Sequence, residues 1–288
     1  MPELPEVQAL ADDLGGRLIG RTVDQLQVPS FAALKTFDPP VSALSGEVVT
    51  AVDRHGKFLD LTVGDIHLIF HLARAGWVRW RQEAPQPSKG LGLGKGPIAA
   101  RLMLDDGSGF DLTEAGTKKS LAIYVVRSPA DVPGIARLGP DPLSPAFTVA
   151  ALGSILGSQG RAQVKGVLRS QSIIAGIGNA YSDEILHVAK MSPFKPASMA
   201  PDDVALLHAA IQSTLRSALD REKGVPASLL KGEKKSNLRV HGRTGEACPV
   251  CGDTIRQVIY SDSTFQYCPT CQTGGKPLAD RVLSRLLK

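Results

Sequence analysis

The sequence predicts an α+β fold in which a β-rich amino-terminal half precedes a helical region and a small metal-binding hairpin. Short apolar runs separated by turn signals fill residues 22–126. From residue 147 onward the apolar residues follow a helical period, and all four cysteines fall in one carboxyl-terminal segment. The 288 residues suffice for two or three domains with a substantial core.

The first expected element is an amphipathic helix over residues 5–18. Val7, Leu10, Leu14 and Leu18 recur on one helical face. Proline suits the first turn of a helix, where its missing N–H would lack an intrahelical partner. One interpretation of residues 2–5, which read Pro-Glu-Leu-Pro, is therefore that they only open this helix.

Eight short strands are expected next, and their close spacing is typical of a sandwich or a barrel. They span residues 22–28, 47–54, 57–63, 66–72, 76–81, 98–104, 109–113 and 121–126. Residues 85–97 are rich in Gly, Pro and Lys and are predicted to form a mobile loop.

The prolines of residues 128–145 indicate a linker to a second, helical region. Helices are expected over residues 147–156, 162–170, 180–188 and 201–220. We expect an amino-terminal domain (1–130), a linker (131–146), a helical domain (147–222), a mobile basic loop (223–237), a zinc-bearing hairpin (238–275) and a basic tail (276–288).

The amino terminus carries a candidate nucleophile. Met1 precedes a small residue, so we expect its removal, which leaves Pro2 with a free secondary amine. A terminal amine has a pKa of about 8, so an appreciable fraction is neutral at pH 7 and can form an imine with an electrophilic carbon. The adjacent carboxyl of Glu3 could move the protons that such a reaction requires.

The four cysteines have the spacing of a zinc site. Cys248 and Cys251 form one pair, Cys268 and Cys271 form the other, and sixteen residues separate the pairs. This pattern predicts one structural zinc ion per chain, held by four thiolates. Two disulfides are the alternative, which suits an oxidising compartment. The chain has no secretory signal and no apolar run long enough to span a membrane.

Charge and glycine placement indicate a polyanionic partner. Of the net charge of +5, residues 221–288 contribute +6, from twelve Lys and Arg against six Asp and Glu. This favours nucleic acid, although ordinary surface lysines remain an alternative. The glycine turn at 176–178, before Asn179, points backbone N–H groups at a site that suits a phosphate. Its spacing does not match a dinucleotide fingerprint, so we expect no nucleotide cofactor.

Three ordered motifs resemble one family. They are residues 2–7 (Pro-Glu-Leu-Pro-Glu-Val), residues 175–184 (Ala-Gly-Ile-Gly-Asn-Ala-Tyr-Ser-Asp-Glu), and residues 240–243 (Val-His-Gly-Arg) leading into the cysteines. The chain thereby resembles the formamidopyrimidine-DNA glycosylase/endonuclease VIII family. The resemblance implies a β-sandwich, a helix–two-turn–helix domain and a zinc finger, with damaged double-stranded DNA bound between the halves. It implies a monomeric glycosylase and AP lyase in the bacterial cytoplasm, associated with the nucleoid.

The resemblance also assigns roles to residues. Pro2 would attack the sugar C1′, Glu3 would transfer protons, and Lys57 occupies the position of the family's β-elimination lysine. His71 and Asn179 match positions that contact DNA phosphates. By themselves, Lys57 could be a solvated strand-edge lysine and His71 a core residue.

Several positions depart from the family pattern. The finger tip, residues 261–267, lacks the usual arginine, so we expect weak δ-elimination. Arg74 and Lys118 stand where the family fills the space left by a flipped base with other residues, and either could do so. The segment 224–237 lacks the aromatic residues that cap 8-oxoguanine, so we expect another preferred lesion. A DNA-damage-binding protein with little glycosylase activity is the alternative.

Overall fold

The computed structural model describes residues 1–83, 98–260 and 263–279. The chain forms two compact units, one of residues 1–137 and 221–231, the other of residues 138–220 and 232–288. The chain leaves the first unit within the proline-rich stretch in which the sequence places a linker. It returns to that unit for eleven residues before the finger begins.

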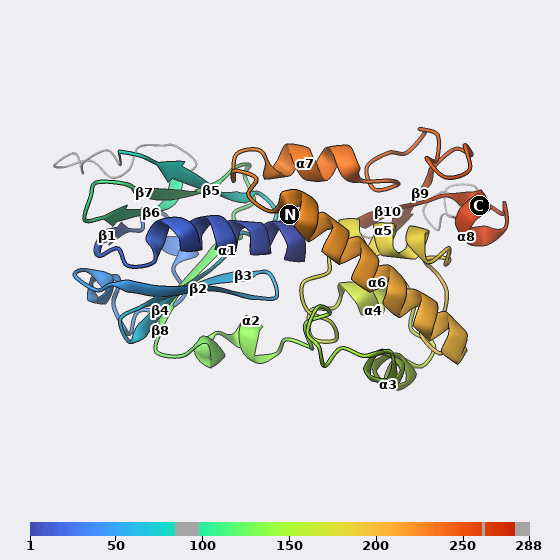
Figure 1. Ribbon diagram of the computed structural model, residues 1–288, viewed down its shortest axis with the longest axis horizontal. Coiled ribbons are helices and arrows are strands. Elements are labelled where there is room, and N and C mark those ends of the chain that lie inside the picture. The colour runs from blue at the N-terminus through green and yellow to red at the C-terminus, as the bar shows by residue number, and fades with distance from the viewer. Residues whose placement is uncertain (84–97, 261–262, 280–288) are drawn as a thin grey trace. The chain divides into compact units, whose positions relative to one another are not determined.

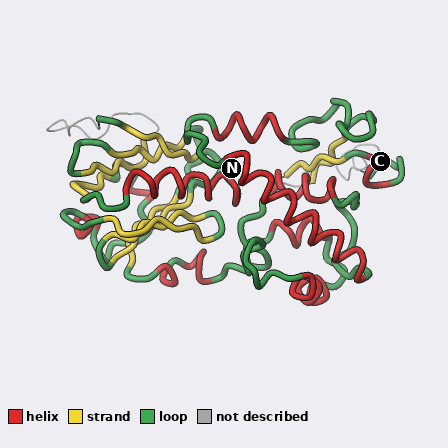
Figure 2. The backbone as a smooth tube through the Cα atoms, in the orientation of Figure 1, coloured by secondary structure: helices red, strands yellow, loops and turns green. Residues whose placement is uncertain are grey.

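The first unit is a β-sandwich of two antiparallel sheets, drawn as two layers in Figures 1 and 2. One sheet has the order β2-β3-β4-β8, with strands β2 (Val49–His55), β3 (Phe58–Val63), β4 (Ile66–His71) and β8 (Ala122–Val126). The other has the order β1-β6-β7-β5, with strands β1 (Val23–Gln27), β6 (Ile98–Leu104), β7 (Gly109–Glu114) and β5 (Gly76–Arg81). The sandwich, rather than the barrel, is therefore the observed architecture.

Helix α1 (Leu4–Leu18) packs against β2 and confirms the predicted amphipathic helix. Its four predicted apolar residues are buried in the sandwich core. Each contributes about 2 kcal/mol by removing apolar surface from water. Four short helices complete the described part of this unit's first segment: η1 (Phe31–Ala33), η2 (Val41–Leu44), η3 (Pro129–Asp131) and α2 (Pro133–Ala136). The loop expected at 85–97 lies outside the described residues.

The second unit contains the predicted helices and the finger. Its helices are α3 (Val149–Gln159), α4 (Val164–Arg169), α5 (Asn179–Val188) and α6 (Pro201–Glu222), the last of which ends in the first unit. The finger contains the loop that carries Cys248 and Cys251, then a hairpin of β9 (Arg256–Tyr260) and β10 (Ser263–Tyr267), and the short helix α8 (Pro269–Thr273). The four predicted helices agree with the observed ones to within three residues at each end.

The structure differs from the loop expected over residues 223–237, because it contains helix α7 (Leu230–Asn237). Ala227 and Leu230 are buried in the sandwich core. Trp77 on β5 donates its indole N–H to the Ala227 carbonyl at 2.9 Å, and the Lys231 ammonium lies 4.4 Å from the Trp77 ring centroid. The partner that orders this segment lies 150 residues away in the sequence, so local periodicity could not reveal it.

No helix in the described part of the chain is long and apolar enough to cross a membrane. The buried α1 face and the two sheets account for the apolar segments of the first unit.

Candidate active site and zinc finger

The four cysteines converge in the finger. Their Sγ atoms all lie within 4.8 Å of one another, and none is in a disulfide. Cys248 and Cys271 are 3.9 Å apart, and Cys251 and Cys268 are 3.3 Å apart, between Sγ atoms. Tetrahedral zinc with Zn–S bonds of about 2.3 Å places its sulfurs about 3.8 Å apart. The site therefore fits one structural zinc ion, as the spacing predicted.

Hydrogen bonds fix the turn at the first cysteine pair and connect it to the second pair. The Cys248 N–H donates to the Asp253 carbonyl at 2.7 Å, across a turn in which Gly252 has a φ of 78°. Glycine suits that left-handed backbone because it has no Cβ. The Asp253 carboxylate accepts the Thr270 backbone N–H at 3.2 Å and its hydroxyl at 2.8 Å, which ties one pair's turn to the other.

Pro2 and Glu3 lie at the start of α1 and are both buried. The Glu3 backbone N–H donates to the Glu6 carboxylate at 2.7 Å, which fixes the first turn of the helix. Leu4, which follows, is fully buried. Pro2, Glu3 and Leu4 are therefore enclosed by the protein, whereas Met1 is half exposed. Glu3, next to Pro2 in the sequence, is only 3% exposed.

Lys57 lies on the turn between β2 and β3 and is 5% exposed, so it is not a solvated strand-edge residue. Arg54 holds this turn. Its Nη1 donates to the Gly56 carbonyl at 3.0 Å, and its Nε donates to the Gln8 amide oxygen on α1 at 2.9 Å. The same arginine therefore connects the Lys57 turn to the helix that begins beside Pro2 and Glu3.

His71 lies at the end of β4, paired with Phe58 in register and with its ring 4.8 Å from the phenyl ring. Burial and the nearby Lys57 charge lower the pKa of His71 to about 4, so the ring is neutral at pH 7. Nδ1 accepts the Ala73 backbone N–H at 3.2 Å. The ring proton therefore resides on Nε2, which makes that nitrogen a donor.

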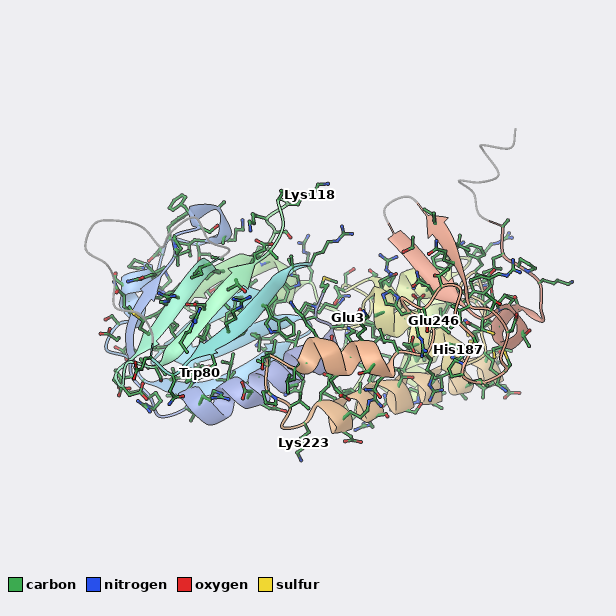
Figure 3. The ribbon with its side chains drawn as sticks, turned by 90° about the horizontal axis from the view of Figure 1, so that it is seen from above. Glu3, Trp80, Lys118, His187, Lys223 and Glu246 are labelled. Carbon is green, nitrogen blue, oxygen red and sulfur yellow. The ribbon has the colours of Figure 1, made fainter. Side chains whose placement is uncertain are left out.

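Arg74 and Lys118 are exposed on separate loops of the sandwich. Arg74 follows Ala73, whose φ of 51° is rare for a residue with a side chain. Lys118 lies in the β7–β8 loop and points away from the strands in Figure 3. The buried Glu114 carboxylate closes that loop by accepting the backbone N–H groups of Ser120 at 2.7 Å and Leu121 at 2.9 Å.

Asn179 begins α5, after the predicted glycine turn. Its Nδ2 donates to the Thr264 carbonyl at 2.7 Å, so the side chain faces the finger. The amide nitrogen carries a second hydrogen, which leaves a donor for another acceptor. Gln171 fixes the turn, because its side chain accepts the Gly176 N–H at 3.0 Å and donates to the Ile177 carbonyl at 2.7 Å.

Sequence reasoning missed buried polar residues that connect the glycine-turn helix α5 to neighbouring segments. On α5, the Asp183 carboxylate pairs with the Lys165 ammonium at 2.6 Å, and the Glu184 carboxylate accepts three backbone N–H groups from residues 239–241. Both carboxylates stand in the motif at 175–184, so their place in it was the available signal. Arg54 carried no such signal, because its partner Gln8 lies 46 residues away in the sequence.

Arg256 lies on β9 of the finger hairpin. It pairs with Tyr267 at the far end of the hairpin from the connection between β9 and β10. Residues 261–262 lie outside the described part of the chain.

Residues 1–115 match the family model of the formamidopyrimidine-DNA glycosylase N-terminal domain. Residues 138–228 match the model of the formamidopyrimidine-DNA glycosylase H2TH (helix–two-turn–helix) domain. A formamidopyrimidine-DNA glycosylase of Symbiobacterium thermophilum is 34% identical over 284 residues, covering 94% of this chain and 89% of that protein. An uncharacterized formamidopyrimidine-DNA glycosylase-like protein of Mycobacterium tuberculosis is 56% identical over 160 residues, covering 55% of this chain and 99% of that protein.

Two solved structures share the fold. The MutM (Fpg) protein of Thermus thermophilus superposes with a TM-score of 0.80 at 28% identity, covering 96% of this chain and 100% of that one. The Lactococcus lactis formamidopyrimidine-DNA glycosylase, noncovalently bound to DNA containing an AP site, gives a TM-score of 0.80 at 25% identity. The superposition covers 94% of this chain and 99% of that one.

The sandwich, the helical unit and the four-cysteine hairpin thus define the architecture of a zinc-finger DNA glycosylase. The chain belongs to the formamidopyrimidine-DNA glycosylase family.

Proposed function

We propose that this family member is a bifunctional DNA glycosylase and AP lyase that works through an imine at Pro2. The observation that carries the proposal is that the segment with Pro2 and Glu3 and the turn with Lys57 are connected through one helix, α1. Pro2 and the buried Glu3 directly precede α1, and Arg54 connects that helix to the turn that carries the buried Lys57. A protein that only binds damaged DNA has no use for an amine, an acid and a buried lysine so arranged.

The first step is base removal. After loss of Met1, the Pro2 nitrogen attacks C1′ of the damaged nucleotide, and the bond from C1′ to the base breaks with its electron pair going to the base, which takes up the proton that the amine loses. Glu3 supplies a proton to the sugar ring oxygen as the ring opens, and an iminium ion joins Pro2 to the sugar. The zinc ion takes no part in these bonds, because four thiolates fill its coordination and its role is to fold the finger.

The second step is strand cleavage. Lys57 removes a proton from C2′ of the iminium, and the bond from C3′ to its phosphate oxygen breaks, which leaves an unsaturated sugar on Pro2. Water then hydrolyses the imine and frees the amine. The nearby His71 is neutral at pH 7 and still offers its Nε2 hydrogen as a donor, so it could contact a phosphate without adding a positive charge beside Lys57.

Damaged double-stranded DNA is the proposed substrate. The Lactococcus lactis relative is bound to DNA containing an AP site. In this chain the Nε2 hydrogen of His71 and the second amide hydrogen of Asn179 would donate to backbone phosphates, which position the duplex without reading its sequence. Arg74 and Lys118, on exposed loops, are the candidates for filling the space that an everted base leaves.

We also propose that 8-oxoguanine is not the preferred lesion and that δ-elimination is weak. The segment 224–231 is fixed to the sandwich through Ala227, Leu230 and Trp77, so it is not free to fold over a large everted base. The sequence of the finger tip has no arginine. We therefore expect higher activity on abasic sites and oxidised pyrimidines than on 8-oxoguanine.

Borohydride trapping on a duplex with one abasic site tests the proposal. The wild-type protein should give a covalent adduct and, without borohydride, a β-elimination product. Lys57→Ala should keep adduct formation within about tenfold while losing strand cleavage by about 100-fold, which is the usual range for a lost general base. Binding of the duplex without any adduct would instead identify a DNA-damage-binding protein.

A further inference from the structure

One face of helix α5 is directed at the finger. Asn179, Asp183 and His187 are spaced four residues apart, which places them on the same side of the helix. Each contacts a different part of the finger: the Thr264 carbonyl at 2.7 Å, the Gln266 backbone N–H at 3.3 Å, and the Cys248 sulfur at 3.3 Å, respectively. Figure 3 labels His187 among the side chains beside this hairpin.

The contact between His187 and Cys248 is enclosed. The imidazole is 2% exposed and the cysteine is 3% exposed, so water does not compete for either group. The ring's Nε2 lies 3.3 Å from Sγ, while its Nδ1 has no hydrogen-bond partner among the described residues. Within the described part of the chain, the hydrogen bond of this imidazole is therefore made to a zinc ligand.

The chemistry of the sulfur sets the direction of that hydrogen bond. A cysteine that binds zinc is a thiolate, which has no hydrogen and can only accept. The Nε2 atom must then carry the hydrogen and donate it. Zinc with four thiolates has a net charge of −2, and Cys248 is one of the two cysteines most shielded from solvent. A buried donor at this ligand replaces the solvation that burial removes.

We propose that His187 is a positioning residue of the zinc finger, donating from α5 to the Cys248 thiolate and thereby slowing zinc loss. Outer-sphere partners of metal ligands typically change metal affinity by about 10- to 100-fold when removed. Because Asn179 lies on the same helical face, the bond also connects the zinc site to the residue proposed to contact phosphate. The finger and α5 are then held together by the metal site as well as by packing.

Zinc transfer to a chromogenic chelator measures the effect directly, and it does not depend on the proposed glycosylase activity. His187→Phe keeps a ring of similar size without the donor, and it should release zinc at least about tenfold faster than wild type. His187→Gln retains a side-chain N–H and should recover part of the loss. His208→Phe is the matched control, since His208 lies on α6 and bonds to the Phe147 carbonyl at 2.8 Å. It should release zinc within twofold of wild type.

A release rate for folded His187→Phe within twofold of wild type would overturn the proposal. A second measurement needs no variant. In wild-type protein loaded with ¹¹³Cd, the His187 Nε2 hydrogen should show scalar coupling to the metal through the Cys248 sulfur. A resolved Nε2–H signal without that coupling would also overturn the proposal, whereas a merely space-filling ring would produce no coupling.

Discussion

His71, a half-buried side chain, has a lowered pKa that leads to a measurable property of the protein. The ring lies against Phe58, near the Lys57 charge, and both burial and that charge favour its neutral form. Because Nδ1 accepts the Ala73 N–H, the neutral ring still presents a donor at Nε2. A protonated histidine is therefore not needed for a contact with phosphate.

The lowered pKa of His71 predicts an acid-dependent loss of stability. Unfolded histidine binds a proton near pH 6.5, whereas folded His71 does so only near pH 4. Between these values the unfolded state holds more protons, so the free energy of unfolding falls as the pH falls. His71→Gln should lose less stability than wild type between pH 7 and pH 4.5, by on the order of 2 kcal/mol. Denaturant melts at both pH values measure this, and equal losses in the two proteins would contradict it.

At the residue scale, the sequence predicted what local chemistry can show. The amine beside Glu3 and the four cysteines are recognisable from neighbours a few positions apart. The interpretation of Lys57 as a solvated residue could be decided only by its burial in the fold, and the contact of His71 with a phosphate stays a prediction. His187 was not recognised, because its partner Cys248 is 61 residues away.

At the scale of elements, Arg54 is the connection between α1 and the β2–β3 turn. The Gln8 amide is oriented by its donation to Asp12 at 2.9 Å, which leaves its oxygen facing the Arg54 Nε. The guanidinium can then reach the Gly56 carbonyl with a second N–H. A lysine would have to make both bonds from one nitrogen, because it lacks the planar fork of separate donor nitrogens that Arg54 uses.

Arg54→Gln should separate the two proposed chemical steps. Without its bonds to Gln8 and Gly56, the Lys57 turn loses its fixed position, and a shift of about 1 Å can cost about 100-fold in rate. We expect strand cleavage to fall at least about tenfold, while adduct trapping at Pro2 stays within about threefold. Single-turnover kinetics on an abasic duplex measure both.

Arg127→Gln is the control for this variant, because Arg127 is an exposed arginine of the same unit with one exposed partner, Asp38, at 3.6 Å. It should match wild type in both steps. Equal losses of trapping and cleavage in Arg54→Gln would show that Arg54 supports the fold in general and has no particular role at Lys57.

Element prediction succeeded where the pattern was local. The α1 stripe, the strands of the sandwich and the four helices of residues 147–222 follow from periodicity and turn signals. Helix α7 was missed because Lys231, Lys234 and Lys235 leave it without an apolar stripe. Its order comes from Leu230 in the sandwich core and from the Trp77 contacts nearby, which are tertiary interactions.

At the scale of the whole molecule, two units with separate cores predict separate responses to metal removal. The sandwich core contains no cysteine, whereas the finger core includes Cys248 and Cys268. Zinc binding provides much of the folding free energy of such small metal sites. After chelation of zinc, the backbone amides of residues 238–260 and 263–275 should therefore lose their protection from hydrogen exchange. The amides of β3 and β4 should stay protected.

Hydrogen exchange read by mass spectrometry checks this prediction, with metal analysis giving one zinc per chain before chelation. Restored zinc should restore the protection. Loss of protection in β3 and β4 at the same chelator concentration would mean that the units do not unfold separately.

The central claim is that the Pro2 nitrogen forms the covalent bond to DNA. Peptide mapping of the borohydride-trapped adduct on abasic-site DNA tests it most directly. The account predicts that Met1 is absent and that the sugar mass is attached to the peptide beginning at Pro2, with Pro2→Gly sharply reducing the adduct. An adduct on a lysine peptide, or an intact Met1 on trapped protein, would contradict it.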